Sequence, residues 1–167
     1  CEEYSHDVPY SLPVPPSPNL RSDLSIQLYP SLCLLEATTV TIGRGTDYPF
    51  EVYGHPDFPP TGFSFTPKSG YGSKDPKQEG KKCNGYHLTD EKYQRMDQLD
   101  FSFLVNANKL LHGKLFIDRD KFFNLFAGND ILIEQLRSGL SQTEIRSSWE
   151  PKLGDFKEIR EKYLIYK

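Results

Sequence analysis

The sequence lacks a long apolar run, an excess of basic residues and a cysteine framework, and each absence excludes a class of protein. No segment approaches the roughly 20 apolar residues that a membrane-spanning helix needs. Lysine and arginine total 20 against 23 acidic residues, and they are scattered, so the charge pattern of a nucleic-acid-binding protein is missing. Three cysteines cannot all pair within the chain, so a disulfide scaffold is not expected.

Motifs for metal binding or nucleophilic catalysis are missing as well. The four histidines show no metal-site spacing, and HExxH, CxxC and GxSxG do not occur. We therefore expect no metal and no cofactor. With 167 residues, of which 37% are hydrophobic, the chain can form one globular domain with a substantial core.

Proline density divides the chain into residues 1–20 and 21–167. Five prolines fall between Pro9 and Pro18, where a fixed φ and missing N–H groups exclude a helix or a central strand. We expect residues 1–20 to be an extended connector and residues 21–167 to be a single domain. A short helix is predicted at 23–28, ending before Pro30.

The pattern of residues 21–167 predicts an α+β fold, with a small, mostly antiparallel sheet in the first half and the helices of the second half packed on it. Short apolar and β-branched runs predict strands at 32–35, 37–42, 50–53, 62–66 and 83–88. A lysine- and glycine-rich segment at 67–82 predicts a long exposed loop. Helices are predicted from Thr89 or Asp90 to about Leu111, from Asp118 to Gly128, from Asn129 toward Gly139, and from the capping box Ser141-Gln142-Thr143-Glu144 onward.

The last predicted helix carries an apolar stripe at helical spacing. Its members are Ile145, Trp149, Leu153, Phe156, Ile159 and Tyr163. We expect this stripe to face the core. Because Pro151 removes one helical hydrogen bond, a kink or restart is expected near Glu150.

An arginine between two glycines is the most informative local motif. Gly43-Arg44-Gly45 follows a β-branched run, and two glycines allow a tight turn in which the backbone comes close to a ligand. Such a turn can present a guanidinium to an anion. The alternative is a hairpin turn in which Arg44 forms an ion pair with Glu36 or Asp47.

Further motifs occur in order along nearly the whole chain. They are Ser17-Pro18-Asn19-Leu20, the run 28–36, Gly43-Arg44-Gly45-Thr46, Pro49-Phe50-Glu51, Gly54-His55-Pro56, Phe65-Thr66-Pro67, Lys82-Cys83-Asn84-Gly85-Tyr86, the run 123–128, the run 144–149 and Tyr163-Leu164-Ile165-Tyr166. Together they closely resemble the C-terminal part of the bacterial exo-β-N-acetylmuramidases.

The resemblance implies an enzyme that removes N-acetylmuramic acid from the non-reducing ends of peptidoglycan fragments. It also implies an N-terminal Rossmann-like domain that supplies the principal catalytic glutamate, with the cleft between the two domains. On this basis the present chain is one wall of the cleft and is inactive alone. The full-length protein is expected to be bacterial and periplasmic or secreted, although the first residues here show no signal peptide. The alternative is a non-catalytic domain that binds an anionic sugar or acts as a scaffold.

Candidate site residues follow from the chemistry of muramic acid, which carries a lactyl carboxylate. A planar guanidinium binds a carboxylate bidentately, so Arg44 is the first candidate for substrate binding. Glu36 is the candidate catalytic carboxylate, since it ends an apolar run where partial burial favours the protonated form, but it can equally be the structural partner of Arg44. A pair of Glu36 with Glu51 is a further option. Other substrate-binding candidates, each with a turn, cap or core role as the alternative, are Thr46, Asn19, Gly43, Gly45, His55 and Tyr29.

Overall fold

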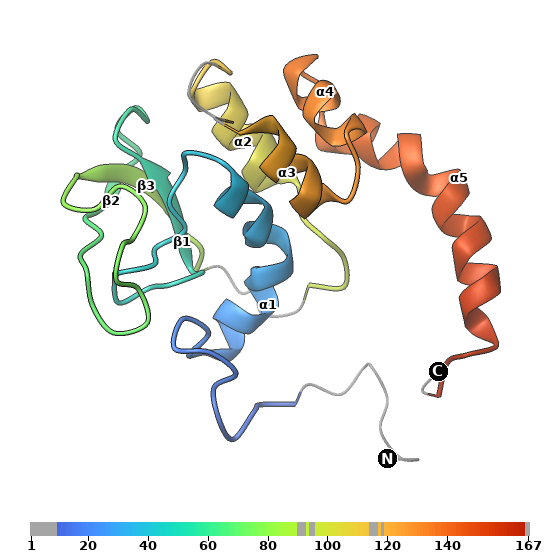
Figure 1. Cartoon of the computed structure of the whole chain (residues 1–167), viewed down its shortest axis with the longest axis horizontal. Coiled ribbons are helices and arrows are strands. Elements are labelled where there is room, and N and C mark those ends of the chain that lie inside the picture. Colours follow the sequence, from blue (N-terminus) through green and yellow to red (C-terminus); the bar gives the residue numbers. More distant parts are fainter. Residues whose placement is uncertain (1–9, 90–92, 94–95, 114–116, 118, 166–167) are drawn as a thin grey trace.

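A small sheet lies at one side of the molecule in the computed structural model, which describes residues 10–89, 93, 96–113, 117 and 119–165 (Figure 1). The strands are β1 (Val52–His55), β2 (Phe63–Phe65) and β3 (Cys83–His87). Their order is β1-β3-β2, and both neighbouring pairs are antiparallel. The predicted antiparallel sheet in the first half of the chain is therefore confirmed.

Beside the sheet lie helix α1 (Asp23–Leu32) and the 3-10 helix η1 (Cys33–Ala37). Ser22 caps α1, because its hydroxyl accepts a hydrogen bond from the backbone N–H of Ser25 at 3.0 Å and donates to the carboxylate of Glu51. The predicted stop before Pro30 is wrong, as is the predicted strand at 32–35. Leu28, Leu32 and Leu35 recur at helical spacing and are fully buried, whereas Pro30 lies on the exposed side.

The predicted strand at 37–42 is reduced to a single antiparallel bridge between Thr41 and Gly54 of β1. Local hydrogen bonds hold the chain in a turn ahead of it. The Thr38 hydroxyl donates to the carbonyl of Leu35 at 2.7 Å and accepts from the N–H of Val40 at 3.1 Å. A side chain that bonds to nearby backbone in this way competes with strand pairing, which explains the failure of β-propensity here.

The described residues of the second half of the chain form four α-helices. They are α2 (Ser102–Leu110), α3 (Asp120–Ala127), α4 (Ile131–Arg137) and α5 (Gln142–Glu161). The prediction of one helix from Thr89 or Asp90 to about Leu111 is wrong, because residues 96–101 are not helical; Asp90 itself lies outside the described residues. There the N–H of Asp100 donates to Ser31 of α1 at 2.9 Å, and the Asp100 carboxylate accepts from the N–H of Ser102 at 2.8 Å.

The predicted ends of the later helices agree better with the structure. Gly128 follows α3 with a φ of 71°, and the Asn129 side chain accepts from the N–H groups of Ile131 and Leu132. Ser141 and Glu144 form the predicted capping box at the start of α5. Asp118, the expected cap of the helix that ends at Gly128, lies outside the described residues.

The core lies where the sheet, α1 with η1, and the later helices meet. In Figure 1 α1 lies beside the sheet with α2 and α3 above it, and η1 contacts both α1 and α3. Tyr53 of β1 packs on Phe103 of α2 with ring centroids 5.6 Å apart, and its hydroxyl accepts from Asn106 at 2.9 Å. Phe123, Leu104, Leu136 and Ile145 from the later helices are also fully buried. Helices therefore cover one side of an antiparallel sheet, as an α+β fold requires.

Helix α5 departs from the predicted arrangement. Ile145 is buried and Trp149 packs partly against the core, but Leu153, Phe156 and Ile159 are 41%, 56% and 58% exposed. The C-terminal part of the helix extends away from the body of the molecule (Figure 1). The expectation that the whole stripe faces the core is wrong, and so is a restart near Glu150, because α5 continues through Pro151. Within the described residues, no helix is both long and apolar enough to span a membrane.

Candidate functional site

A cleft of about 370 Å³ lies beside the Gly43-Arg44-Gly45 turn. Its walls come from η1, from the segment that bridges to β1 and from part of the loop between β2 and β3. The lining residues are Glu36, Val40, Thr41, Ile42, Arg44 and residues 72–77. Five of these are charged, namely Glu36, Arg44, Lys74, Asp75 and Lys77, so the cleft is suited to a polar or anionic ligand.

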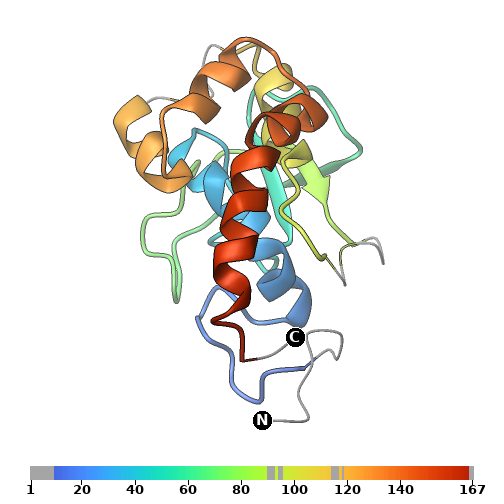
Figure 2. The same cartoon turned by 90° about the vertical axis from the view of Figure 1, so that its right-hand side faces the viewer.

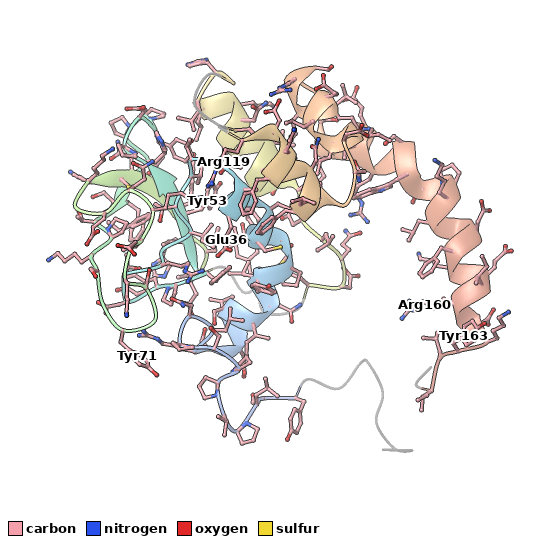
Figure 3. All side chains as sticks on the ribbon, in the orientation of Figure 1. Glu36, Tyr53, Tyr71, Arg119, Arg160 and Tyr163 are labelled. Atoms are coloured by element: carbon pink, nitrogen blue, oxygen red, sulfur yellow. The ribbon has the colours of Figure 1, made fainter. Side chains whose placement is uncertain are left out.

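Arg44 and Glu36 meet in this cleft. Nη1 of Arg44 donates to Oε1 of Glu36 at 3.2 Å. The side chains are 41% and 26% exposed, so both remain accessible to a ligand. Glu36 projects from η1 (Figure 3). The sequence left an ion pair with Glu36 open as the alternative to ligand binding by Arg44. Because the pair lies in an open cleft, Arg44 can form the ion pair and still contact a ligand.

Lys77 fixes the backbone that carries Glu36. Its Nζ donates to the carbonyls of Leu35 at 3.3 Å and Glu36 at 2.9 Å, and also to that of Thr38. The carbonyls at the end of a helix have no partner within the helix and carry partial negative charge, so a cation stabilises them. Sequence reasoning missed Lys77, because nothing distinguishes it from the other lysines of segment 67–82.

The two glycines of the turn are required by the protein itself. Gly43 and Gly45 have φ angles of 79° and 81°. A Cβ on Gly45 would lie 2.5 Å from the carbonyl oxygen of Lys68, whose own N–H donates to the Gly45 carbonyl at 2.8 Å. A Cβ on Gly43 would lie 2.5 Å from the carbonyl oxygen of Tyr48. Neighbouring loops therefore approach this turn closely, and contact of Gly43 and Gly45 with a ligand stays a prediction.

Thr46 and Asn19 also bind the protein backbone. The Thr46 hydroxyl donates to the carbonyl of Gly43 at 2.6 Å, and the buried Asn19 amide donates to the carbonyl of Gly72 at 2.9 Å. Asn19 thus tethers the loop that forms one wall of the cleft. Thr46 lines an adjoining hollow of about 440 Å³ together with Arg21, Lys68 and the 86% exposed Tyr71, which is directed outward at the edge of the molecule (Figure 3).

His55 and Tyr29 lie outside the lining of the cleft. His55 is buried in β1, where its Nδ1 accepts from the N–H of Asp57 at 3.1 Å. Burial lowers the pKa of His55 below its ordinary value, although the nearby carboxylate of Asp57 opposes this shift. Tyr29 is 43% exposed and packs edge-on against Phe50 at a centroid distance of 5.3 Å.

Two further residues of the cleft were not found from the sequence. Asp75 is a second carboxylate beside Glu36, whereas Glu51 does not line the cleft and instead accepts from Ser22. Thr41 also lines the cleft, and its buried hydroxyl oxygen has no hydrogen-bond partner among the described residues. In the sequence Thr41 resembles an ordinary strand residue and Asp75 belongs to a predicted exposed loop, so neither is distinguished by a local signal.

No group of three or more metal-ligating side chains occurs in the part of the chain that the structure describes.

Comparison with known proteins gives one consistent family. Residues 27–166 match the family described as exo-beta-N-acetylmuramidase NamZ, C-terminal. The peptidoglycan beta-N-acetylmuramidase NamZ of Bacillus subtilis (strain 168) is 30% identical over 170 residues, which cover 90% of this chain and 40% of the relative. The chain therefore spans less than half the length of this relative.

Solved structures agree with this comparison. A DUF1343 family protein from Bacteroides fragilis NCTC 9343 is 38% identical, with a TM-score of 0.89 over 99% of this chain and 47% of that protein. A second DUF1343 family protein from the same organism has a TM-score of 0.69 at 19% identity, which shows a similar fold alone.

Gly45→Ala tests whether the turn needs a glycine for close packing as well as for its φ. Gly62 is the matched control, because its φ is 86° and a Cβ added there would meet no neighbouring atom within 4 Å. We expect Gly62→Ala to cost about 1–2 kcal/mol of unfolding free energy from its left-handed backbone. Gly45→Ala adds the clash with Lys68, roughly 1–3 kcal/mol more. Urea unfolding of both variants measures the difference, and equal losses would contradict the packing argument.

The buried position of His55 leads us to expect that the unfolding free energy falls on acidification. Because its pKa in the folded protein is lowered, the unfolded chain binds more protons once the pH falls below the ordinary histidine pKa of about 6.5. The stabilisation is complete above that pH and is lost as the pH falls toward the folded-state pKa. We expect His55→Asn, which keeps an acceptor for Asp57, to flatten the profile of unfolding free energy between about pH 7.5 and 5. Parallel profiles for both proteins would rule this out.

Proposed function

The chain belongs to the C-terminal family of exo-beta-N-acetylmuramidase NamZ, and we propose that it forms the substrate-recognising wall of such an enzyme's cleft. In this proposal the full-length protein releases N-acetylmuramic acid from the non-reducing ends of peptidoglycan fragments. Arg44 binds the lactyl carboxylate that distinguishes this sugar from N-acetylglucosamine.

The length of the relatives supports a second domain in the full-length protein. The chain covers 40% of the Bacillus subtilis relative, and the matched family is named as C-terminal, so the further part precedes it. Glycoside hydrolysis by the usual mechanism needs two carboxyl groups that flank the scissile bond. We propose that a Rossmann-like N-terminal domain supplies the principal catalytic carboxylate, and that the isolated chain is inactive.

The observation that carries the proposal is the accessible guanidinium of Arg44 in the cleft. An arginine has five N–H donors, and among the described residues Glu36 is the hydrogen-bond partner of Arg44, through Nη1 alone. The remaining donors can form a bidentate pair with a ligand carboxylate. Lys77 holds η1, which carries Glu36, and the bond from Lys68 to Gly45 holds the turn that carries Arg44, so the pair comes from two fixed segments.

Glu36 supports recognition by holding Arg44 before the ligand arrives. A long arginine side chain loses conformational freedom on binding, and a partner that orients it beforehand lowers this cost. The cationic Lys74 also lines the cleft and favours an anionic ligand. We further propose Glu36 as a carboxylate that acts on the glycosidic bond, because it is both accessible and fixed by its backbone.

Replacing Arg44 in the full-length protein tests recognition. We expect Arg44→Ala to lower kcat/KM for a muramic-acid substrate by a factor that corresponds to roughly 1.5–3 kcal/mol of transition-state stabilisation, the usual worth of a charged hydrogen bond. Arg44→Lys is expected to lose the bidentate part of this interaction. The N-acetylglucosamine analogue, which lacks the lactyl carboxylate, is expected to respond much less. Arg137→Ala is the matched control, since Arg137 pairs with Asp120 and Glu134 on the surface.

Two results would contradict recognition by Arg44. One is an equal loss for both substrates, and the other is a melting temperature of Arg44→Ala far below that of the wild type. A full-length protein that binds muramic-acid glycans without cleaving them would instead support the non-catalytic alternative, in which the domain holds an anionic sugar.

Glu36→Gln in the full-length protein separates catalysis from orientation. If the carboxylate takes part in proton transfer, kcat falls by about 10²–10⁴-fold while KM changes little. Asp75→Asn is the matched control within the same cleft, and its kcat is expected to stay close to that of the wild type. A rise in KM with unchanged kcat would assign Glu36 to the orientation of Arg44 alone.

A further inference from the structure

The free part of α5 presents a continuous apolar face rather than scattered apolar residues. Leu153, Phe156 and Ile159 are 41%, 56% and 58% exposed, and Tyr163 just beyond the helix is 72% exposed. Single exposed apolar residues are normal on a protein surface, whereas a contiguous apolar patch marks an interaction site. This stripe, residues 153–163, is therefore a surface that needs a partner.

The same part of α5 is poorly stabilised by its own sequence. All its residues from Pro151 to Glu161 are exposed. Isolated helices shorter than about 12–15 residues are marginal in water, and Pro151 and Gly154 are both unfavourable inside a helix. Packing of the apolar stripe against another element is the usual source of stability for such a helix.

Two hollows between α5 and the body continue the apolar stripe. One, of about 510 Å³, is lined by residues that include Leu34, Phe101, Phe126 and Ile131, with Trp149 of α5. The other, of about 600 Å³, is lined by Leu99, Trp149, Leu153 and Phe156 among others. Because Trp149 and Leu99 border both, the hollows form one apolar groove along the inner side of α5.

We propose that this groove and the stripe 153–163 are the docking surface for the preceding domain of the full-length polypeptide. The inference rests on the proposed function only in taking the full-length protein to contain that domain. The solved relative with a TM-score of 0.89 matches 99% of this chain, yet the match covers 47% of its own length, so a part of similar size is available to cover the groove.

The path of the chain supports this occupant. Residues 10–20 extend toward the same end of the molecule as the free part of α5 (Figures 1 and 2). Tyr10, Leu12 and Val14 in this segment are 69%, 44% and 72% exposed. A preceding domain that is joined through this segment would lie at the same end of the molecule as the uncovered stripe, and its docking would cover both apolar surfaces.

Amide hydrogen exchange of the full-length protein tests the proposal. We expect the amides of residues 152–161 to exchange at least tenfold faster in the double variant Phe156→Gln/Ile159→Gln than in the wild type. Glutamine is as good a helix former as the residues replaced, so the intrinsic helix propensity does not fall. Leu125→Gln on α3 is the matched control, because Leu125 is 79% exposed, and it is expected to leave α5 exchange unchanged.

Exchange that is equally fast in the wild type and the double variant would overturn the proposal. Protection of α5 that rises with protein concentration and follows dimer formation by light scattering would also overturn it, since a second copy would then be the occupant. Activity is measured separately. A protected α5 in a protein that releases no muramic acid refutes the proposed function alone, and an unprotected α5 in an active protein refutes the docking surface alone.

Discussion

The ammonium group of Lys77 at the end of η1 is the contact on which the cleft depends. It joins the carbonyls of Leu35, Glu36 and Thr38 to a loop about 40 residues later in the chain. Without this contact the carbonyls of Glu36 and Thr38 would lose a hydrogen-bond donor, and the loop that forms the opposite wall would lose one of its anchors. Glu36 and Arg44 are eight residues apart and can pair locally, but only the loop encloses them in a cleft.

The loop between β2 and β3 is held at several other points. The N–H of Lys68 donates to Gly45, the Asn19 amide donates to Gly72, and the Gln78 amide donates to the carbonyl of Thr39 at 2.9 Å. Each of these bonds pairs a backbone carbonyl with a donor from a distant part of the chain. A segment that is rich in lysine and glycine is therefore ordered by tertiary hydrogen bonds, and its conformation supplies half of the site.

Local signals in the sequence predicted local structure well. The capping box at Ser141, the Asn129 cap and Gly128 after α3 were all identified, because each depends on residues within a few positions of one another. The strand predicted at 32–35 failed because an apolar run fits a buried helix equally well. The start of α2 failed because Asp100 bonds to Ser31, about 70 residues earlier, and no local pattern encodes that contact.

The residues of the candidate site also divide into those that local sequence predicts and those that only tertiary folding brings to the cleft. The ion pair of Arg44 with Glu36 was predicted as an alternative because the two residues are near in sequence, whereas Lys77, Asp75 and Thr41 reach the cleft only through tertiary folding. The stripe on α5 was recognised correctly as an apolar face. Periodicity identifies a face that must be covered, but it does not identify what covers it.

The contacts of Lys77 also bear on the order in which the parts of the cleft form during folding. Helices α3 and α4 and the pair of Glu36 with Arg44 need only short loops to close, and such contacts form early and at little entropic cost. The second wall of the cleft requires closure of a loop of 41 residues between Glu36 and Lys77. We therefore expect a folding chain to form the pair of Glu36 with Arg44 before the loop that carries Lys77 completes the cleft.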